Sequence, residues 1–75
     1  MDTVTITQMV RERCKERGVS VKSTLEAAGV DKGFIYDTEK RGFVPQIATM
    51  AALADVLECS IDYLAGRTDK PEVNR

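Results

Sequence analysis

The apolar positions of this chain recur at three- and four-residue steps, the spacing that buries one face of a helix. A first stretch runs from Ile6 to Arg17 and stops at Gly18. A second covers residues 20–28 and stops at Gly29, a residue suited to the left-handed conformation that often ends a helix. Ser20 can cap this second segment. The pattern therefore predicts two helices in the first third of the chain.

A third helix is predicted after the turn at Gly29. The carboxylate of Asp31 can accept the backbone N–H groups that have no partner at a helix start. Ile35 and Thr38 then supply the inward side of the helix. Residues 20–42, SVKSTLEAAGVDKGFIYDTEKRG, thus read as two short helices joined by a tight turn, which is a helix-turn-helix signature.

Two further helices follow. Pro45 can begin a helix over residues 46–57, with a broad apolar stripe made of Ile47, Met50, Ala51, Leu53, Ala54 and Leu57. Ser60 caps a short fifth helix that ends at Gly66. We therefore predict an all-α, five-helix domain over residues 6–66, between a flexible arm at residues 1–5 and a flexible tail at residues 67–75.

Composition excludes several classes of function. The 75 residues include no histidine, so imidazole-based catalysis and imidazole metal ligands are excluded. Cys14 and Cys59 form no CxxC pair, and we expect reduced core thiols and no metal or other cofactor. The serines lack a plausible base, so we expect no enzyme. With no signal peptide or apolar span, a cytoplasmic location follows by default and no membrane partner is expected.

The net charge of −1 is unusual for a nucleic-acid-binding domain, which often carries an excess of basic residues. Residues 1–42 hold eight Lys and Arg against seven Asp and Glu, a balance of +1. Residues 43–75 hold three against five, a balance of −2. Any contact with DNA must therefore depend on the local placement of cations and backbone donors rather than on a strong overall field.

The five-helix order resembles the lambda-repressor-like family of phage repressors, Cro proteins and bacterial regulators. The resemblance covers residues 6–66 and rests mainly on AAGVDKGFIYDTEKRG, on Pro45 and on ALADVLECSIDYLAGRTD. Two departures concern the third helix. Glu39 stands three residues before Gly42, where many members place an acidic residue two before, so this helix or its loop is expected to be one residue longer. Thr38 replaces a larger apolar residue, which leaves Ile35 and Val30 as the expected anchors.

The resemblance implies that the third helix enters the major groove of DNA. Successive residues of a helix are about 100° apart around its axis. If Ile35 points inward, Gly33, Asp37 and Lys40 point most directly outward. Phe34 and Tyr36 flank them. The predicted base-contacting residues are Lys32, Gly33, Phe34, Tyr36 and Asp37. The predicted phosphate-contacting residues are Val21, Lys22 and Ser23 at the start of the second helix, with Lys40 and Arg41.

The expected function is that of a bacterial or phage transcriptional regulator, a repressor, that binds specific sequences of double-stranded DNA. We expect a homodimer on a pseudo-palindromic operator and no small-molecule ligand. The dimer surface is expected in the region of the fourth and fifth helices, near Tyr63 and Leu64, unless Tyr63 completes the core. The alternative is a protein-interaction module of the same fold, an antirepressor or partner-binding domain with little DNA affinity. The acidic balance and Asp37 favour this alternative.

Overall fold

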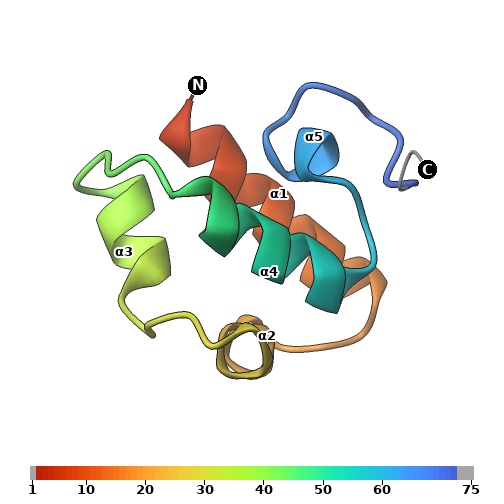
Figure 1. Ribbon diagram of the computed structural model, residues 1–75, viewed down its shortest axis with the longest axis horizontal. Coiled ribbons are helices and arrows are strands. Elements are labelled where there is room, and N and C mark those ends of the chain that lie inside the picture. Colours follow the sequence, from red (N-terminus) through yellow and green to blue (C-terminus); the bar gives the residue numbers. More distant parts are fainter. Residues whose placement is uncertain (1, 73–75) are drawn as a thin grey trace.

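A computed structural model describes residues 2–72, which form five helices and no strand within that range. The helices are α1 (Thr3–Glu16), α2 (Val21–Ala28), α3 (Phe34–Glu39), α4 (Ile47–Leu57) and α5 (Ile61–Leu64). Helix α4 packs on α2 and α5, while α1 contacts α2, α3 and α5. Figure 1 shows α3 at the left end of the molecule, with α1 and α4 between it and α5. The predicted all-α class and the five-helix order are confirmed.

Every helix contributes to one apolar core. Its buried members are Ile6, Val10 and Cys14 of α1, Leu25 of α2, Phe34 of α3, Met50, Leu53, Ala54 and Leu57 of α4, and Cys59, Tyr63 and Leu64 around α5. Helices as short as α3 and α5 are marginal by themselves, so this shared core holds them in place. The two cysteines are free, buried thiols, and burial raises the pKa of the Cys59 thiol.

The start of α1 differs from the prediction of a flexible arm over residues 1–5, of which residue 1 lies outside the described residues. Helix α1 begins at Thr3, where the Asp2 carboxylate accepts the N–H of Val4 at 3.0 Å. This cap stabilises a first helical turn whose side chains are partly exposed, so the apolar pattern gave no signal for it. A methyl group added at Gly66 would lie 2.5 Å from Cγ2 of Thr5, so the first turn of α1 closely approaches the end of α5.

The predicted tail begins as irregular chain but is tied to the domain. Residues 67–72 form no helix, yet the carbonyl of Pro71 accepts the N–H of Ser60 at 2.9 Å. Ser60 also caps α5 as predicted, because its Oγ accepts the N–H of Tyr63 at 3.0 Å. Residues 73–75 of the predicted tail lie outside the described residues.

One apolar side chain lies where the sequence pattern did not place it. Ile47, expected in the core, is 71% exposed. It is the first residue of α4 and lies about 120° around the helix from the fully buried Leu53, so the stripe centred on Leu53 does not include it. Tyr63 and Leu64 are buried, at 5% and 0% exposure, so Tyr63 completes the core, which was the expected alternative, and neither side chain is available to a partner. A dimer surface elsewhere on the fourth and fifth helices stays a prediction.

The side chain of Arg13 connects α1 to the end of α4. Its Nε donates to the Leu57 carbonyl at 3.0 Å, and a terminal nitrogen donates to the Glu58 carbonyl at 3.1 Å. The last carbonyls of a helix have no partner within the helix, so a charged donor there satisfies them. Glu58 itself has a φ of 53°, in the left-handed region, and ends α4 where a glycine would be the usual choice. Arg13 therefore supports a turn that the local sequence does not favour.

Replacement of Arg13 by alanine should lower the free energy of unfolding by about 2 kcal/mol, because two carbonyls lose a charged donor. Urea unfolding followed by circular dichroism measures the difference. Lys15→Ala is the matched control, since both residues are basic and lie in the last turn of α1. The control should change stability by less than about 0.5 kcal/mol. Equal losses in the two variants would contradict the role of Arg13 at the end of α4.

Candidate nucleic-acid interface

The connection between α2 and α3 is a tight turn that begins at Gly29. This residue has a φ of 69° and is the C-cap of α2, as predicted. The Gly29 N–H donates to the Glu26 carbonyl at 3.1 Å, and the Val30 N–H donates to the Leu25 carbonyl at 2.9 Å, both in the last turn of α2. Glycine adopts this left-handed conformation without the steric cost that a side chain would add. The turn therefore fixes the direction in which the chain leaves α2.

Asp31 organises the turn before α3 but is not its N-cap. The Asp31 carboxylate accepts the N–H of Gly33 at 3.3 Å, and its carbonyl accepts the N–H of Phe34 at 3.0 Å. The N-cap position belongs to Gly33, which has no side chain to accept a hydrogen bond, and α3 begins at Phe34. The predicted N-cap role of Asp31 is therefore wrong, since the N-cap position lies two residues later.

Helix α3 is rotated relative to the predicted orientation. Phe34 is 8% exposed and Thr38 is 2% exposed, whereas Ile35 is only half buried. The prediction that Phe34 contacts a base is therefore wrong, since its ring belongs to the core. Phe34 and Thr38 are four positions apart and lie on the same face of the helix. Ile35 is about 100° away from Phe34 around the helix axis, so it cannot be at the middle of that buried face. The inward position predicted for Thr38 is confirmed.

The rotation places Tyr36 at the middle of the outward face. Its side chain is 63% exposed. Lys32, in the turn before α3, and Lys40, just after its end, are also exposed. The three exposed residues stand at four-residue steps, with Lys32 before α3, Tyr36 inside it and Lys40 just after its last residue. We call them the exposed stripe.

Gly33 lies beside this stripe in an ordinary conformation, with a φ of −78°. A methyl group added there would be 3.5 Å from Oδ2 of Asp37, an ordinary contact distance. The fold therefore does not require glycine at this position. Its predicted role, a close approach of the backbone to bases, stays a prediction.

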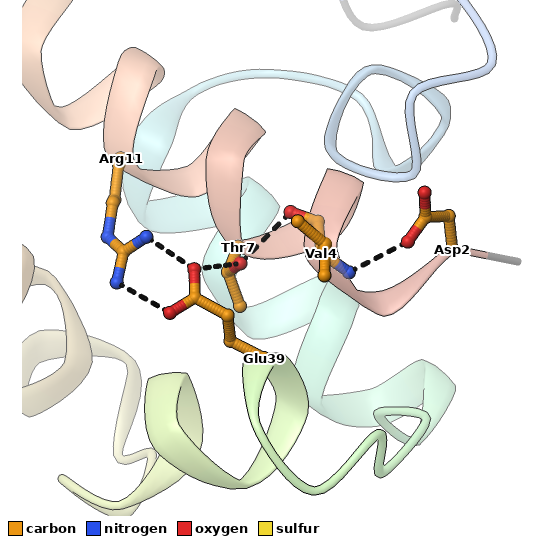
Figure 2. Close-up of polar contacts among 5 residues, drawn as sticks. All are labelled: Asp2, Val4, Thr7, Arg11 and Glu39. Carbon is orange, nitrogen blue, oxygen red and sulfur yellow. Dashed lines mark hydrogen bonds and ion pairs between the residues drawn. The ribbon is translucent and has the colours of Figure 1, made fainter.

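The acidic residue Glu39 is the last residue of α3 and is held by α1. Figure 2 shows the Glu39 carboxylate between Arg11 and Thr7. The Arg11 guanidinium donates to both oxygens, at 2.5 and 3.3 Å, and Thr7 Oγ1 lies 3.1 Å from Oε1. Thr7 is fully buried, and its hydroxyl is also 3.0 Å from the Val4 carbonyl, so its one proton serves one acceptor at a time. The hydrogen bond from Arg11 lowers the pKa of Glu39 and raises the pKa of Arg11.

Asp37 and Arg41 form a second pair at the other side of α3. Their charged atoms are 3.6 Å apart, and the Arg41 guanidinium lies 4.6 Å from the centre of the Phe43 ring. The carbonyl of Asp37 accepts the N–H of Phe43 at 3.1 Å. Asp37, predicted to contact a base, and Arg41, predicted to contact a phosphate, therefore contact each other across the loop after α3. This pairing offsets the negative charge that counted against a DNA contact.

The start of α2 carries the other predicted phosphate contacts. Ser20 caps the helix as predicted, since its Oγ accepts the N–H of Ser23 at 3.0 Å. The Ser23 hydroxyl donates to the Ser20 carbonyl at 3.0 Å. Both donors of Ser23 are therefore engaged within the chain. The N–H groups of Val21 and Lys22, with the Lys22 ammonium, are better placed to receive an anion at this positive end of the helix dipole.

The structure separates some of the predicted residues from one another. Val21, Lys22 and Lys32 line one cleft of about 700 Å³, between α1, α2 and the start of α3, to which Arg11 also contributes. Lys22, Lys32 and Lys40 make no ion pair with another residue among residues 2–72. Phe34 and Asp37 face away from this cleft, toward the loop before α4. The structure thus joins the start of α2 to the start of the exposed stripe and separates Asp37 from them.

Two residues that position α3, Arg11 and Thr7, could not be identified from the sequence pattern. In the sequence, Arg11 looks like a solvated charge on the outer face of the first helix, and Thr7 looks like an ordinary helical residue. Arg11 is 28 residues from Glu39 in sequence, and Thr7 is 32 residues away, so no local spacing links them. The sequence feature that marked this region was Glu39 itself, which stands three residues before Gly42 where the family it resembles often places an acidic residue two before.

Comparison with known proteins gives no match: no family model, no curated protein and no solved structure matches this chain. Among residues 2–72, no group of His, Cys, Asp or Glu side chains has an arrangement that could hold a metal ion. No helix in the same range is long and apolar enough to cross a membrane. The site must therefore be interpreted from its own geometry.

The contact between Glu39 and Arg11 should make stability depend on pH. Because the pKa of Glu39 is lower in the folded chain, its contribution is complete above the ordinary value of 4.5 and is lost as the pH falls below it. Glu39→Gln should lower the melting temperature by a few degrees at pH 7 and flatten the dependence of stability on pH below about 4.5.

Thermal unfolding measured between about pH 3 and pH 7 tests this effect. Glu26→Gln is the control, because Glu26 is an exposed carboxylate of α2 that makes no ion pair among residues 2–72. A Glu39→Gln curve that parallels the curve of the unchanged protein would argue against the contact.

Proposed function

We propose that this protein is a sequence-specific binder of double-stranded DNA, a transcriptional repressor that places α3 in the major groove. The observation that carries the proposal is the exposed stripe of Lys32, Tyr36 and Lys40 along α3. Two cations that flank an aromatic side chain match the donors and apolar surface that base edges and phosphates accept. In this proposal α2 and α3 act as a helix-turn-helix.

The pairing of the nearby acids supports the proposal. Glu39 is neutralised by Arg11, and Asp37 is neutralised by Arg41. The cations of the exposed stripe therefore meet a phosphate backbone with less local repulsion than the net charge of −1 suggests. Val21 and Lys22 at the start of α2 would bind one phosphate, which fixes the register of α3 in the groove.

The proposal includes two copies on a pseudo-palindromic operator, with their α3 helices in successive major grooves roughly 34 Å apart. Selection from a randomised duplex library, followed by sequencing, tests both parts. A symmetric enriched motif is the expected result. Absence of binding to any duplex at low salt would reject DNA binding and favour the alternative, a partner-binding domain.

The salt dependence of binding should identify the phosphate contacts. Lys40→Ala should reduce the slope of log affinity against log salt by about one, because one released counterion is lost. Lys70→Ala removes the same charge from the chain beyond α5, outside α2 and α3, and should leave the slope unchanged. Fluorescence anisotropy between about 50 and 200 mM salt measures both slopes. Equal changes would mean that only the net charge matters.

Tyr36 should contribute to specificity and not to folding. Tyr36→Ala is expected to lower affinity for the selected sequence about tenfold and to relax the preference at one or two base positions. Its unfolding free energy should change by less than about 0.5 kcal/mol, because the side chain is 63% exposed. Tyr36→Phe separates the hydroxyl from the ring. Unchanged specificity in Tyr36→Ala would remove this residue from the interface.

A further inference from the structure

A groove lies beside α3, between the end of α2 and the start of α4. Its volume is about 420 Å³, within the range of about 300–1,000 Å³ that is usual for binding clefts. Phe43 and Val44 line it and are 52% and 62% exposed. The rest of its apolar lining consists mainly of small side chains, which include Ala28, Val30, Pro45, Ala48 and Ala52. Large apolar side chains exposed together beside a groove are a feature of interaction surfaces.

The charged side chains that line this groove are both acidic. They are Asp31, in the turn before α3, and Asp37, within α3. Among residues 2–72, no lysine or arginine belongs to the lining. A negatively charged surface repels phosphates, so the groove does not suit the backbone of DNA. It favours a positively charged group instead. We call this surface the acidic groove.

One oxygen of each carboxylate is open to an outside donor. Oδ1 of Asp31 accepts the N–H of Gly33, and the charged atom nearest to Arg41 is Oδ1 of Asp37. Oδ2 of each aspartate accepts no hydrogen bond from residues 2–72. These two Oδ2 atoms lie 3.8 and 3.5 Å from the point that a methyl group on Gly33 would occupy. They are therefore no further apart than the sum of these distances, about 7 Å.

A cation between the two carboxylates would offset their mutual repulsion. Asp31 makes no ion pair among residues 2–72. The pair of Asp37 with Arg41 spans 3.6 Å, beyond hydrogen-bond distance, so Asp37 keeps its capacity to accept hydrogen bonds. A guanidinium carries five N–H donors in a planar fork and can donate to two carboxylates at once. An arginine from another molecule is thus the cation that fits best.

The exposed apolar wall favours a protein segment over a small molecule. Sites for small molecules usually bury about 70–90% of the ligand, whereas Phe43 and Val44 are themselves more than half exposed. A segment of chain supplies an arginine for the carboxylates and a neighbouring aliphatic side chain for the apolar lining. Both halves of the acidic groove then have a partner.

We propose that the acidic groove binds a segment of a different protein in which an arginine stands next to a large aliphatic residue. The guanidinium lies between Asp31 and Asp37, and the aliphatic side chain lies against Val44 and Ala48. This contact goes beyond DNA binding and does not rest on it.

Amide NMR spectra of the full chain, recorded without DNA, test the proposal with a capped tripeptide of leucine, arginine and leucine at up to about 5 mM. The expected shifts are confined to the groove residues, such as Ala28, Val44, Ala48 and Ala52. The same peptide with citrulline in place of arginine keeps the shape without the charge. It should bind at least tenfold more weakly. Equal binding of the two peptides, or no shift at the groove residues, would overturn the proposal.

Two variants test the carboxylates directly. Asp31→Asn and Asp37→Asn should each weaken binding of the arginine peptide about fivefold. Asparagine at position 31 keeps an oxygen for the Gly33 N–H, so the turn before α3 is retained. Asp55→Asn is the control, because Asp55 is an exposed acid of α4 that does not line this groove. Equal losses in all three variants would mean that only net charge matters and would overturn the proposal.

Other occupants of the acidic groove give different results. Agmatine carries a guanidinium without the apolar neighbours, and its binding as tightly as the peptide would assign the groove to a small amine. Shifts of the groove residues when the protein alone is concentrated would assign it to a second copy. Either result would overturn the proposal.

The experiments without DNA keep this inference separate from the proposed function. A protein that binds a selected duplex but not the arginine peptide would overturn this inference alone. A protein that binds the peptide in the acidic groove but no duplex would support this inference and reject the proposed function.

Discussion

The position of α3 depends on the contact between the Glu39 carboxylate and α1. Helix α3 has six residues and no side-chain cap at its start, so its own hydrogen bonds cannot hold it. Phe34 and Thr38 place one face of it in the core, and Arg11 with Thr7 fixes its last residue. Core and ion pair together determine which residues of α3 face outward. The outer surface of this short helix is thus set in part by two residues of α1, Thr7 and Arg11.

The parts of the fold that local chemistry determines could be predicted from the sequence. The caps at Ser20 and Ser60 and the helix end at Gly29 each depend on a few neighbouring residues, and each is present. The rotation of α3 could not be predicted in the same way. Phe34 and Ile35 are adjacent and both apolar, and the choice between them depends on packing against distant helices. Ile47 shows the same limit, since periodicity identifies an apolar face but not how far along the helix its packing extends.

The charge distribution explains why the net charge is a poor guide to this surface. Acidic and basic residues are nearly equal in number, but the two acids of α3 are each paired, while Lys32 and Lys40 make no ion pair among residues 2–72. A sum over the sequence counts all of these side chains equally. The residues of the candidate site could therefore be proposed from the sequence, but the charge distribution around them depends on contacts between residues that lie far apart in the chain.

The hydrogen bond from Ser60 to Pro71 has a consequence for the extent of the domain. The first backbone amide of the α5 region finds its acceptor eleven positions further along, beyond the last helix. A fragment that stops at Gly66 would contain all five helices and still leave that amide without its acceptor. The hydrogen-bonded part of the domain therefore extends to Pro71, and during synthesis this hydrogen bond cannot form until that residue has left the ribosome.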